Sequence, residues 1–385
     1  SHNPPSDNAV KVYWSGGVQV LPPHDKGIIE RVMQVNEISR FPFDDGVENG
    51  RVVFMEDEID PAFVRAVLKQ ATPGSRDLSV VYTPLHGVGA TAVLPVLQAA
   101  GFQNVRLYGP QAEPNGDFPN VPGHVANPEN PEVLTGAIEE ARSRSDDVVM
   151  ASDPDCDRLG AAAALGPMKD SDWKTFTGNQ LGALLAEWVL ETKRRQNVLQ
   201  PTDTIVTTLV TSGLVRHIGE KYGLNVIDGL QVGFKWIGRT IDDIGPKHFV
   251  FGCEESHGYL AGTHVRDKDA SVAALLLAEL AAELKAQGRT LHQKLDDLFC
   301  IHGCHLERQV AIKLPGAAGM DRMREIMAGL RANPPTELGG LAVRRTRDYG
   351  QLKVHDPEQG EMPLKGEQGD LVIFDLLDPE GTGAK

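Results

Sequence analysis

The sequence predicts an α/β protein with successive βαβαβ domains, mixed and mainly parallel sheets, and a partial α+β domain at its C-terminal end. Three observations favour this class. Short apolar runs with strand character alternate with segments of helical periodicity, as in proteins whose parallel sheets are covered by helices. The alternation restarts after Gly178, which suggests two successive units of similar layout. After about residue 305 the segments become shorter and the pattern changes.

The first unit is expected to alternate between helices and strands. Its apolar runs LSVVY and DVVMAS are typical of buried strands. Pro95 lies inside one helical pattern and should kink or shorten that helix. The expected elements are helix 61–71, strand 78–82, helix 90–100, strand 105–109, helix 131–143 and strand 147–152.

The second unit repeats this rhythm, and a shorter α+β unit follows it. The segment 350–369, rich in Gly, Glu and Lys, is expected to be an exposed loop. The other expected elements are helix 179–194, strand 204–210, helix 212–222, strand 225–227, helix 234–244, strand 248–252, helix 269–287, strand 306–313, helix 319–331, and strands 339–345 and 370–377.

These patterns divide the chain into four expected domains. The first segment is too short to fold alone and looks like the end of a domain whose beginning is absent. The last segment looks incomplete. The expected divisions are 1–45, 46–175, 176–300 and 301–385.

The formal net charge of −15 over 385 residues argues against polyanionic binding partners. Such a surface repels nucleic acid and anionic membranes, so we expect neither as a partner. The most apolar run, 270–284, is interrupted by Glu279 and Glu283, which favours a buried helix over a membrane span. We expect a small-molecule partner and a monomer or weak homodimer. An anionic substrate would need local Lys, Arg or metal charge.

The four cysteines, Cys156, Cys253, Cys300 and Cys304, suit a reducing cytoplasm. Cys300 and Cys304 could lie one helical turn apart, but no second cysteine pair completes a zinc site. We therefore expect these thiols to act as small buried hydrophobic groups.

The most specific feature is an acidic loop with the sequence SDPDCDRLG. Asp153, Asp155 and Asp157 alternate directly after a predicted strand, so their carboxylates face the same way if the chain is extended. Their mutual repulsion favours a hard divalent cation such as Mg²⁺ or Ca²⁺. Such a cation keeps positions open for a phosphate oxygen, and Arg158 could bind the same phosphate.

The acidic loop has two other interpretations. An EF-hand needs glycine at the sixth position and glutamate at the twelfth, where this chain has Arg158 and Ala164. A solvated turn with a capping aspartate remains the alternative.

A second polar loop opens the chain with the sequence SHNPPSDNAVK. A serine hydroxyl is a weak nucleophile unless a base lies near, and His2 and Lys11 are the nearby candidates. A role for His2 in positioning the loop is equally favoured.

This loop resembles the catalytic serine loop of the α-D-phosphohexomutases, the phosphoglucomutase/phosphomannomutase superfamily. Their pattern is Thr-Ala-Ser-His-Asn-Pro, then a short gap to Gly-x-Lys. The given sequence begins at the serine, so the Thr-Ala is not seen, and Ala9 replaces the glycine. The resemblance implies that Ser1 carries the phosphoryl group and that Lys11 transfers protons. The acidic loop matches the family pattern Asp-x-Asp-x-Asp-Arg in full, which implies a Mg²⁺ site made by the three aspartates and Ser1.

A third loop, GCEESHGY, resembles the sugar-binding loop of the same family, although alone it indicates a polar turn or helix cap. The resemblance implies that Glu254 and Ser256 hold sugar hydroxyls, which suits the hydrogen-bonding capacity of both groups. His257 could transfer a proton or bind phosphate.

Three further cations are expected to contact phosphate or substrate. The resemblance assigns phosphate to Arg266 and Lys268, which would otherwise form a surface charge cluster. Lys235 is a weaker candidate, because a helix lysine whose stem packs along the surface explains it nearly as well. Thr83–Gly89 is expected to be a structural turn.

The resemblance implies an enzyme, an isomerase that interconverts sugar 1-phosphate and sugar 6-phosphate, with glucose or mannose as the sugar. The reaction would pass through a phosphoserine and a sugar 1,6-bisphosphate, which also serves as activator. The segment LPPHDKG is similar to the branch that contains phosphoglucomutases and phosphopentomutases. The family's fourth loop, Arg-Pro-Ser-Gly-Thr-Glu-Pro, does not occur in this sequence, so we expect a fragment.

Four alternatives stay open at this point. The protein could be a phosphopentomutase, or a sugar 1,6-bisphosphate synthase that consumes a separate phosphoryl donor. It could also be a sugar-phosphate sensor without activity, or a metal-dependent phosphatase that releases free phosphate.

Overall fold

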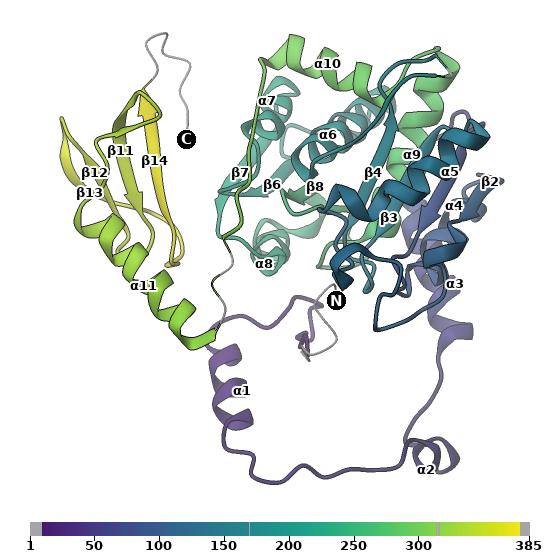
Figure 1. The fold of residues 1–385 in the computed structure, drawn as a ribbon, viewed down its shortest axis with the longest axis horizontal. Coiled ribbons are helices and arrows are strands. Elements are labelled where there is room, and N and C mark those ends of the chain that lie inside the picture. The colour runs from purple at the N-terminus through teal and green to yellow at the C-terminus, as the bar shows by residue number, and fades with distance from the viewer. Residues whose placement is uncertain (1–9, 169, 313, 315, 378–385) are drawn as a thin grey trace. The chain divides into compact units, whose positions relative to one another are not determined.

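The computed structural model describes residues 10–168, 170–312, 314 and 316–377 (Figure 1). Contacts divide the chain into two units. The first unit contains the chain up to Asp228 together with Val232–His305. The second unit contains Gly229–Gln231 and the chain from Leu306 onward. The predicted α/β class is confirmed, whereas the finer division into four domains stays a prediction.

The first unit contains a five-stranded sheet in the order β2-β1-β3-β4-β5. β1 pairs in parallel with β2 and β3, and the antiparallel strands β4 and β5 extend one edge. The strands are β1 (Ser79–Thr83), β2 (Asn104–Leu107), β3 (Val148–Ser152), β4 (Leu159–Ala164) and β5 (Trp173–Thr175).

Helices cover both faces of this sheet because its central strands are apolar on both sides. Val80 and Tyr82 of β1 pack in the cluster that contains α4 (Val93–Ala99) and α9 (Ala270–Ala286). Val81, between them, packs with α5 (Thr135–Arg144) on the other face. This alternation is the period of a β-strand.

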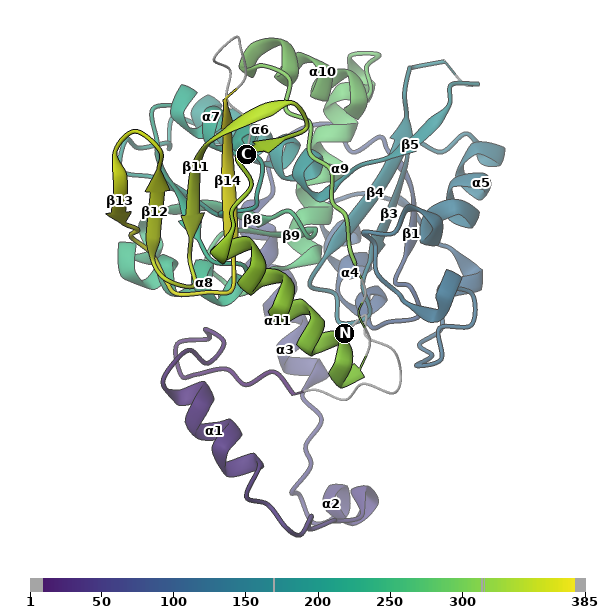
Figure 2. The same ribbon diagram turned by 60° about the vertical axis from the view of Figure 1, so that its left-hand side comes forward.

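A second sheet in the same unit has the order β7-β6-β8-β9. β6 and β8 are parallel, while β8 and β9 form an antiparallel hairpin. Figure 2 shows this sheet beside the first one. Its elements are α6 (Gly178–Arg195), β6 (Thr204–Thr208), α7 (Gly213–Lys221), β7 (Asn225–Leu230), α8 (Phe234–Ile244), β8 (Phe249–Glu254), β9 (Gly258–Ala261) and α10 (Leu291–His302).

The long helix α9 joins the two sheets into one core. It is rich in Ala and Leu on every side and is buried almost throughout, as expected for a helix enclosed by protein. Asp269 caps its N-terminus by accepting the N–H of Ser271. Its internal Glu279, expected to interrupt an apolar run, is buried and accepts hydrogen bonds from Thr72 and Arg76.

Segments before the first sheet are mostly exposed. α1 (His24–Val32) buries no residue and presents Ile29 and Val32 to solvent. α2 (Phe43–Glu48) and α3 (Glu56–Val67) follow. Short 3-10 helices lie at Leu68–Gln70, Gly89–Thr91, Gly109–Gln111, Pro122–His124, Pro131–Leu134 and Pro246–His248. Pro95 falls in the first turn of α4, so it shortens the expected helix without a kink.

The second unit is an antiparallel sheet with one helix. β11 pairs with β10, β12 and β14, and β12 pairs with β13. Its elements are α11 (Gly316–Ala332), β10 (Glu337–Leu338), β11 (Leu341–Asp348), β12 (Lys353–Asp356), β13 (Gly360–Pro363) and β14 (Val372–Leu377).

Two predictions in this unit were wrong. Residues 306–312 form no strand, because no neighbouring strand pairs with them within the described part of the chain and Leu306 is 85% exposed. The expected loop 350–369 contains the hairpin of β12 and β13. Its turn is stabilised by Asp356, whose carboxylate accepts the N–H groups of Glu358 and Gln359.

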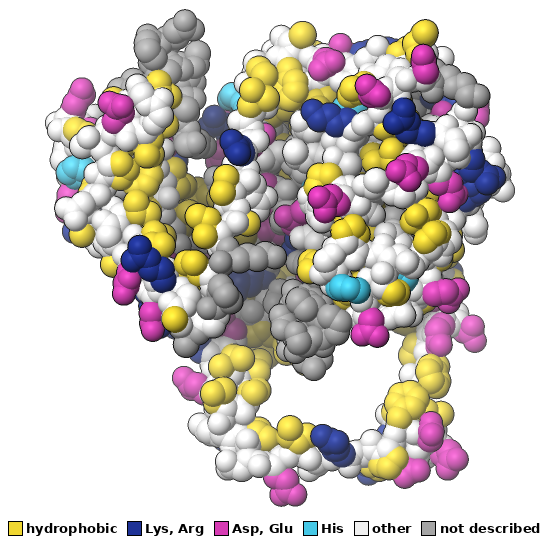
Figure 3. Space-filling view, viewed as in Figure 1, with side chains coloured by type: hydrophobic (Ala, Val, Ile, Leu, Met, Phe, Trp, Pro, Cys, Tyr) yellow, Lys and Arg dark blue, Asp and Glu magenta, His cyan; other side chains and the backbone are white. Residues whose placement is uncertain are grey.

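The surface carries charges of both signs. Asp and Glu side chains are scattered over the face drawn in Figure 3, with Lys and Arg among them. Within the described residues, no helix is long and apolar enough to cross a membrane.

Candidate functional site

The acidic loop leaves the buried strand β3 and returns as β4. Its first aspartate, Asp153, is 1% exposed, and its Oδ1 accepts the N–H groups of Asp157 and Arg158, each at 3.0 Å. These bonds fold the loop back on itself. Carboxylate oxygens of Asp153, Asp155 and Asp157 consequently lie within 4.8 Å of one another.

The turn Thr83–Gly89 supports this loop from the neighbouring strand β1. The N–H of Val88 donates to the carbonyl of Pro154 at 2.9 Å. A Cβ on Gly87 would lie 2.1 Å from the Cα of Pro154, so only glycine allows this approach. The turn is therefore structural, as the sequence suggested.

Three cations surround the aspartates. Nζ of Lys11 lies 2.8 Å from Asp155 and 2.7 Å from Asp157, and Nζ of Lys268 lies 2.9 Å from Asp157. Arg158 binds Glu129 at 2.5 Å and lies 3.8 Å from Asp157. These cations offset the repulsion among the carboxylates, so the loop keeps its shape in a protein of high negative charge.

The cations also determine the protonation states. Burial opposes ionisation of Asp155, but hydrogen bonding to Lys11 lowers its pKa below the usual range. The pKa of Asp157 is also lowered, with burial opposing and the charge of Lys268 favouring the carboxylate. Burial disfavours the charged form of Lys11, yet its hydrogen bonds to both aspartates raise its pKa. Lys11 is thus a bound ammonium group.

This donor set fits a hard divalent cation. Three carboxylates converge, two of them held ionised, and all the converging ligand atoms are oxygen. Oxygen-only ligands suit Mg²⁺ or Ca²⁺ and are poor ligands for softer metals. The described residues contain no other group of three acidic, His or Cys ligands this close together.

The hairpin of β8 and β9 lies beside the acidic loop. A bridge joins Arg158 to Gly258, and the N–H of Leu159 donates to the carbonyl of His257 at 3.0 Å. Glu254, at the end of β8, is 3% exposed, and its Oε1 accepts the N–H of Gly233 at 2.8 Å. Burial raises the pKa of Glu254 to about 7, although Lys268 acts in the opposite direction.

The turn of this hairpin holds Ser256 and His257. Ser256 is half-buried. His257 is buried, and its Nδ1 lies 3.1 Å from the carbonyl of Leu159, so the ring ties the hairpin to β4. Burial lowers the pKa of His257, which keeps the imidazole neutral. The first residue of α6, Gly178, packs against this turn, since a Cβ there would lie 1.9 Å from the carbonyl oxygen of Glu255.

The remaining predicted contacts lie on two neighbouring segments. Arg266 forms an ion pair with Asp242 of α8 at 2.8 Å. Lys235, in the first turn of α8, lies 5.4 Å from the ring centroid of Trp236. This contact agrees with the alternative of a lysine packed on its own helix.

A cavity of about 800 Å³ opens on the acidic loop. Its lining includes five of the charged residues described above: Lys11, Asp155, Asp157, Arg266 and Lys268. Glu254 lies near Lys268 at Gly258. A Cβ added to Gly258 would lie 2.6 Å from the Cδ of Lys268 and 3.5 Å from a carboxylate oxygen of Glu254.

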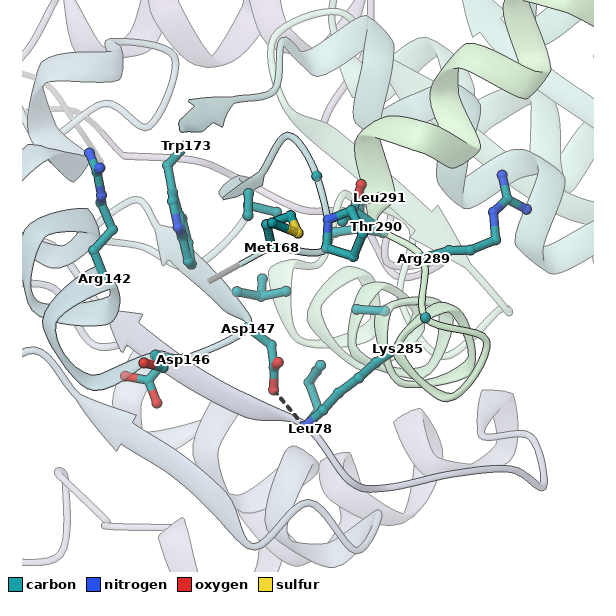
Figure 4. Close-up of a pocket in the computed structure, with 18 residues that line it drawn as sticks. Leu78, Arg142, Asp146, Asp147, Met168, Trp173, Lys285, Arg289, Thr290 and Leu291 are labelled. Atoms are coloured by element: carbon teal, nitrogen blue, oxygen red, sulfur yellow. Dashed lines mark hydrogen bonds and ion pairs between the residues drawn. The ribbon is translucent and has the colours of Figure 1, made fainter. Parts of the chain in front are cut away.

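Another cavity, of about 360 Å³, lies at the opposite end of β3 (Figure 4). Both acidic side chains that line it have basic partners: Asp147 accepts from Lys285 at 3.0 Å, and Asp146 pairs with Arg106 outside the lining. This cavity is lined in part by Trp173 and Met168 and contains none of the residues singled out in the sequence.

Sequence reasoning missed several parts of the site. Tyr13 donates to Asp267 at 2.7 Å, and Glu129 binds Arg158, but neither belongs to a recognisable motif. The proximity of Tyr13 to Lys11 in sequence was the only available signal. Ser1 and His2, the predicted nucleophile and its neighbour, lie outside the described residues.

Models of the phosphoglucomutase/phosphomannomutase family match most of the chain. The α/β/α domain I model matches residues 1–39, the domain II model residues 60–166 and the domain III model residues 177–300. The acidic loop falls in the second match, and the hairpin with Glu254 falls in the third.

Curated relatives agree with these matches. A Haemophilus influenzae protein named "Probable phosphomannomutase" is 32% identical over 396 residues, which cover 100% of this chain and 74% of the relative. A Staphylococcus haemolyticus phosphoglucomutase is 31% identical, over 100% of this chain and 70% of its own length. A structure of a Burkholderia thailandensis phosphoglucomutase/phosphomannomutase family protein aligns with a TM-score of 0.52 and 17% identity, over 82% of this chain and 59% of that one.

The α/β fold, the acidic loop and these matches define a sugar-phosphate mutase, a class of isomerase. The chain belongs to the phosphoglucomutase/phosphomannomutase family. The two curated relatives are longer than this chain, which spans 74% and 70% of their lengths.

Proposed function

We propose that this protein interconverts sugar 1-phosphate and sugar 6-phosphate, with glucose or mannose as the sugar, through phosphorylated Ser1 and a bound sugar 1,6-bisphosphate. The observation that carries the proposal is the position of Lys11. Lys11 follows the serine segment, and its ammonium group binds both Asp155 and Asp157. The residue that ends the SHNPPSDNAVK motif is thereby held at the acidic loop.

Asp153, Asp155 and Asp157 would hold Mg²⁺, with Ser1 as a further ligand. When bound, Mg²⁺ supplies positive charge that stabilises the charge developing on a transferring phosphoryl group. Asp153 also orients the loop, because its other hydrogen bonds go to the backbone of Asp157 and Arg158.

Lys11, Lys268 and Arg266 would bind the phosphate groups of the substrate. Each of them lines the same cavity, and each is held by a carboxylate partner, so their positions are fixed before substrate arrives. Preorganised charge of this kind stabilises a transition state without reorganisation. Because Lys11 is an ammonium group here, it can donate a proton to the serine oxygen as the phosphoryl group leaves, and the amine so formed can take the proton of the attacking sugar hydroxyl.

Glu254 and Ser256 would hold the sugar hydroxyls. Glu254 already uses Oε1 to accept from Gly233, which fixes the carboxyl group. With a pKa of about 7, it can accept or donate a hydrogen bond at neutral pH. Both functions suit a sugar that must bind in two orientations, with either its 1-position or its 6-position at Ser1. His257 would position this turn more than transfer protons, because it is bonded to β4.

The test is turnover of glucose 1-phosphate by the complete protein with Mg²⁺ and glucose 1,6-bisphosphate, followed by phosphorus NMR, with mannose and ribose phosphates in parallel. The proposal predicts glucose 6-phosphate without net release of phosphate, and loss of turnover in Ser1→Ala. Release of free phosphate would indicate a phosphatase, and accumulation of bisphosphate from a separate donor would indicate a synthase. Preference for ribose 1-phosphate would indicate a phosphopentomutase.

We propose a cytoplasmic monomer or weak homodimer whose partners are small sugar phosphates and not nucleic acid or membrane. The net charge of −15 supports this, because it disfavours anionic surfaces in general.

A further inference from the structure

Two histidines meet outside the site described above. Nδ1 of His217 lies 3.2 Å from Nε2 of His305, and the two rings have centroids 5.1 Å apart at an interplanar angle of 65°. His217 lies on α7, and His305 follows the end of α10. The two helices contact each other at the same end of the first unit in both views (Figures 1 and 2).

The segment that ends with His305 is rich in metal-binding side chains. It has the sequence CIHGCH from Cys300 to His305. α10 ends at His302, and Gly303, with φ of 89°, turns the chain out of the helix. Cys304 therefore lies beyond the helix and between His302 and His305, and not one helical turn after Cys300.

We propose that His217, His305 and Cys304 form a site for a transition-metal ion such as Zn²⁺. Two nitrogen ligands about 2.0–2.1 Å from a tetrahedral Zn²⁺ lie about 3.3 Å apart. The observed separation of 3.2 Å between Nδ1 of His217 and Nε2 of His305 matches this value. The same two atoms can share a hydrogen bond when no metal is bound.

Cys304 completes the site as its third ligand. Its thiol is free and its side chain is exposed, so it can rotate towards the adjacent His305. His302, two residues before Cys304 in the sequence, is a candidate fourth donor. The sequence suggested no zinc site because it lacks a second cysteine pair, but α7 supplies the missing ligand.

The ligand types make this site different from the aspartate cluster. Imidazole and thiolate select Zn²⁺, Co²⁺ or Cu²⁺, whereas the oxygen-only cluster at Asp153 suits Mg²⁺. Positive charge nearby opposes binding, since a guanidinium nitrogen of Arg216 lies 3.3 Å from Nε2 of His217. Two carboxylates offset this charge, because Nε of Arg216 lies 3.8 Å from both Glu220 and Asp228.

Cobalt titration of the 385-residue chain in excess Mg²⁺, which saturates the aspartates, tests the site. We expect one tightly bound Co²⁺ with visible bands of tetrahedral geometry and a thiolate charge-transfer band, and displacement by Zn²⁺. His217→Ala and His305→Ala should each weaken binding by more than the roughly 10–100-fold that loss of an outer-sphere partner costs. Cys304→Ser should remove the charge-transfer band.

Matched variants separate metal binding from folding. Cys300→Ser and His248→Ala remove the same side chains elsewhere and should leave the spectrum unchanged. His305→Gln keeps a polar side chain, and circular dichroism of the metal-free variants checks that each is folded. The proposal is wrong if the wild-type chain shows no tetrahedral band, or if the band persists in folded His217→Ala and His305→Gln.

Discussion

Nζ of Lys11 lies 2.7 Å from Asp157 and 2.8 Å from Asp155, although 146 and 144 residues separate these pairs in the sequence. One ammonium group thus compensates two of the three carboxylates that we propose as Mg²⁺ ligands. Lys11 consequently has two effects: it ties its own segment to the acidic loop, and it would compete with the metal for the same oxygens.

Lys11→Met should strengthen Mg²⁺ binding while it slows phosphoryl transfer. A partly exposed ion pair contributes about 0.5–1 kcal/mol, so the dissociation constant for Mg²⁺ should fall by about two- to fivefold. Isothermal titration calorimetry measures this, with Lys247→Met as the control at an exposed lysine. Equal Mg²⁺ affinity in wild type and Lys11→Met would show that the ammonium group does not compete.

Asp157→Asn should abolish metal-dependent turnover. The charge that a metal supplies to phosphoryl transfer amounts to several kcal/mol, so turnover should fall by at least about 100-fold. Chelation of Mg²⁺ in the wild-type protein should have the same effect, reversed by added Mg²⁺. Asp172→Asn, at an exposed aspartate, serves as the control. A chelated enzyme with normal turnover would exclude the metal from the reaction.

Glu254 should make stability fall as pH rises. Its pKa is about 7 in the folded chain and near 4.5 when unfolded, so the folded state binds the extra proton between these values. The free energy of unfolding should decrease from pH 4.5 to pH 7 by on the order of 3 kcal/mol, and the loss should be complete above pH 7.

Urea unfolding of Glu254→Gln across this pH range isolates the contribution of the carboxyl group. The amide oxygen can still accept from Gly233, and the variant should lack this component of the pH dependence. Glu139→Gln, at an exposed glutamate, should behave like wild type. Identical pH profiles for wild type and Glu254→Gln would contradict a raised pKa.

Gly87→Ala should displace the acidic loop. The added Cβ would lie 2.1 Å from the Cα of Pro154, and backbone atoms must move to make room. We expect a loss of about 1–3 kcal/mol in the free energy of unfolding, with weaker Mg²⁺ binding. Gly109→Ala adds the same methyl group where no atom lies within 4 Å and should change neither quantity.

Predictions from the sequence were best where a single strand leads into a chemical motif. The acidic loop follows β3, and the GCEESHGY motif begins in β8, so the predicted strands placed both motifs. β4, by contrast, was not predicted. Its sequence LGAAAA has helical propensity, but it is buried between β3 and β5, where only small side chains fit, as the contact of Gly160 with Pro128 shows.

Contacts between segments far apart in the chain could not be predicted from the sequence. The ion pair of Arg158 with Glu129 depends on the path of the loop that carries Glu129, which has no sequence motif. The contact of His217 with His305 depends on the packing of α7 against α10. The strand expected at 306–313 failed for a related reason, since an apolar alternation forms a strand only where a partner strand is available.

The most direct test of the central claim is the phosphorylation state of Ser1. The complete protein would be incubated with Mg²⁺ and glucose 1,6-bisphosphate labelled in both phosphates, and the peptide that contains Ser1 analysed by mass spectrometry. Our account predicts label on Ser1, its transfer to glucose 6-phosphate on addition of unlabelled substrate, and neither event in Asp157→Asn. A protein that converts glucose 1-phosphate to glucose 6-phosphate while Ser1 stays unlabelled would contradict the account.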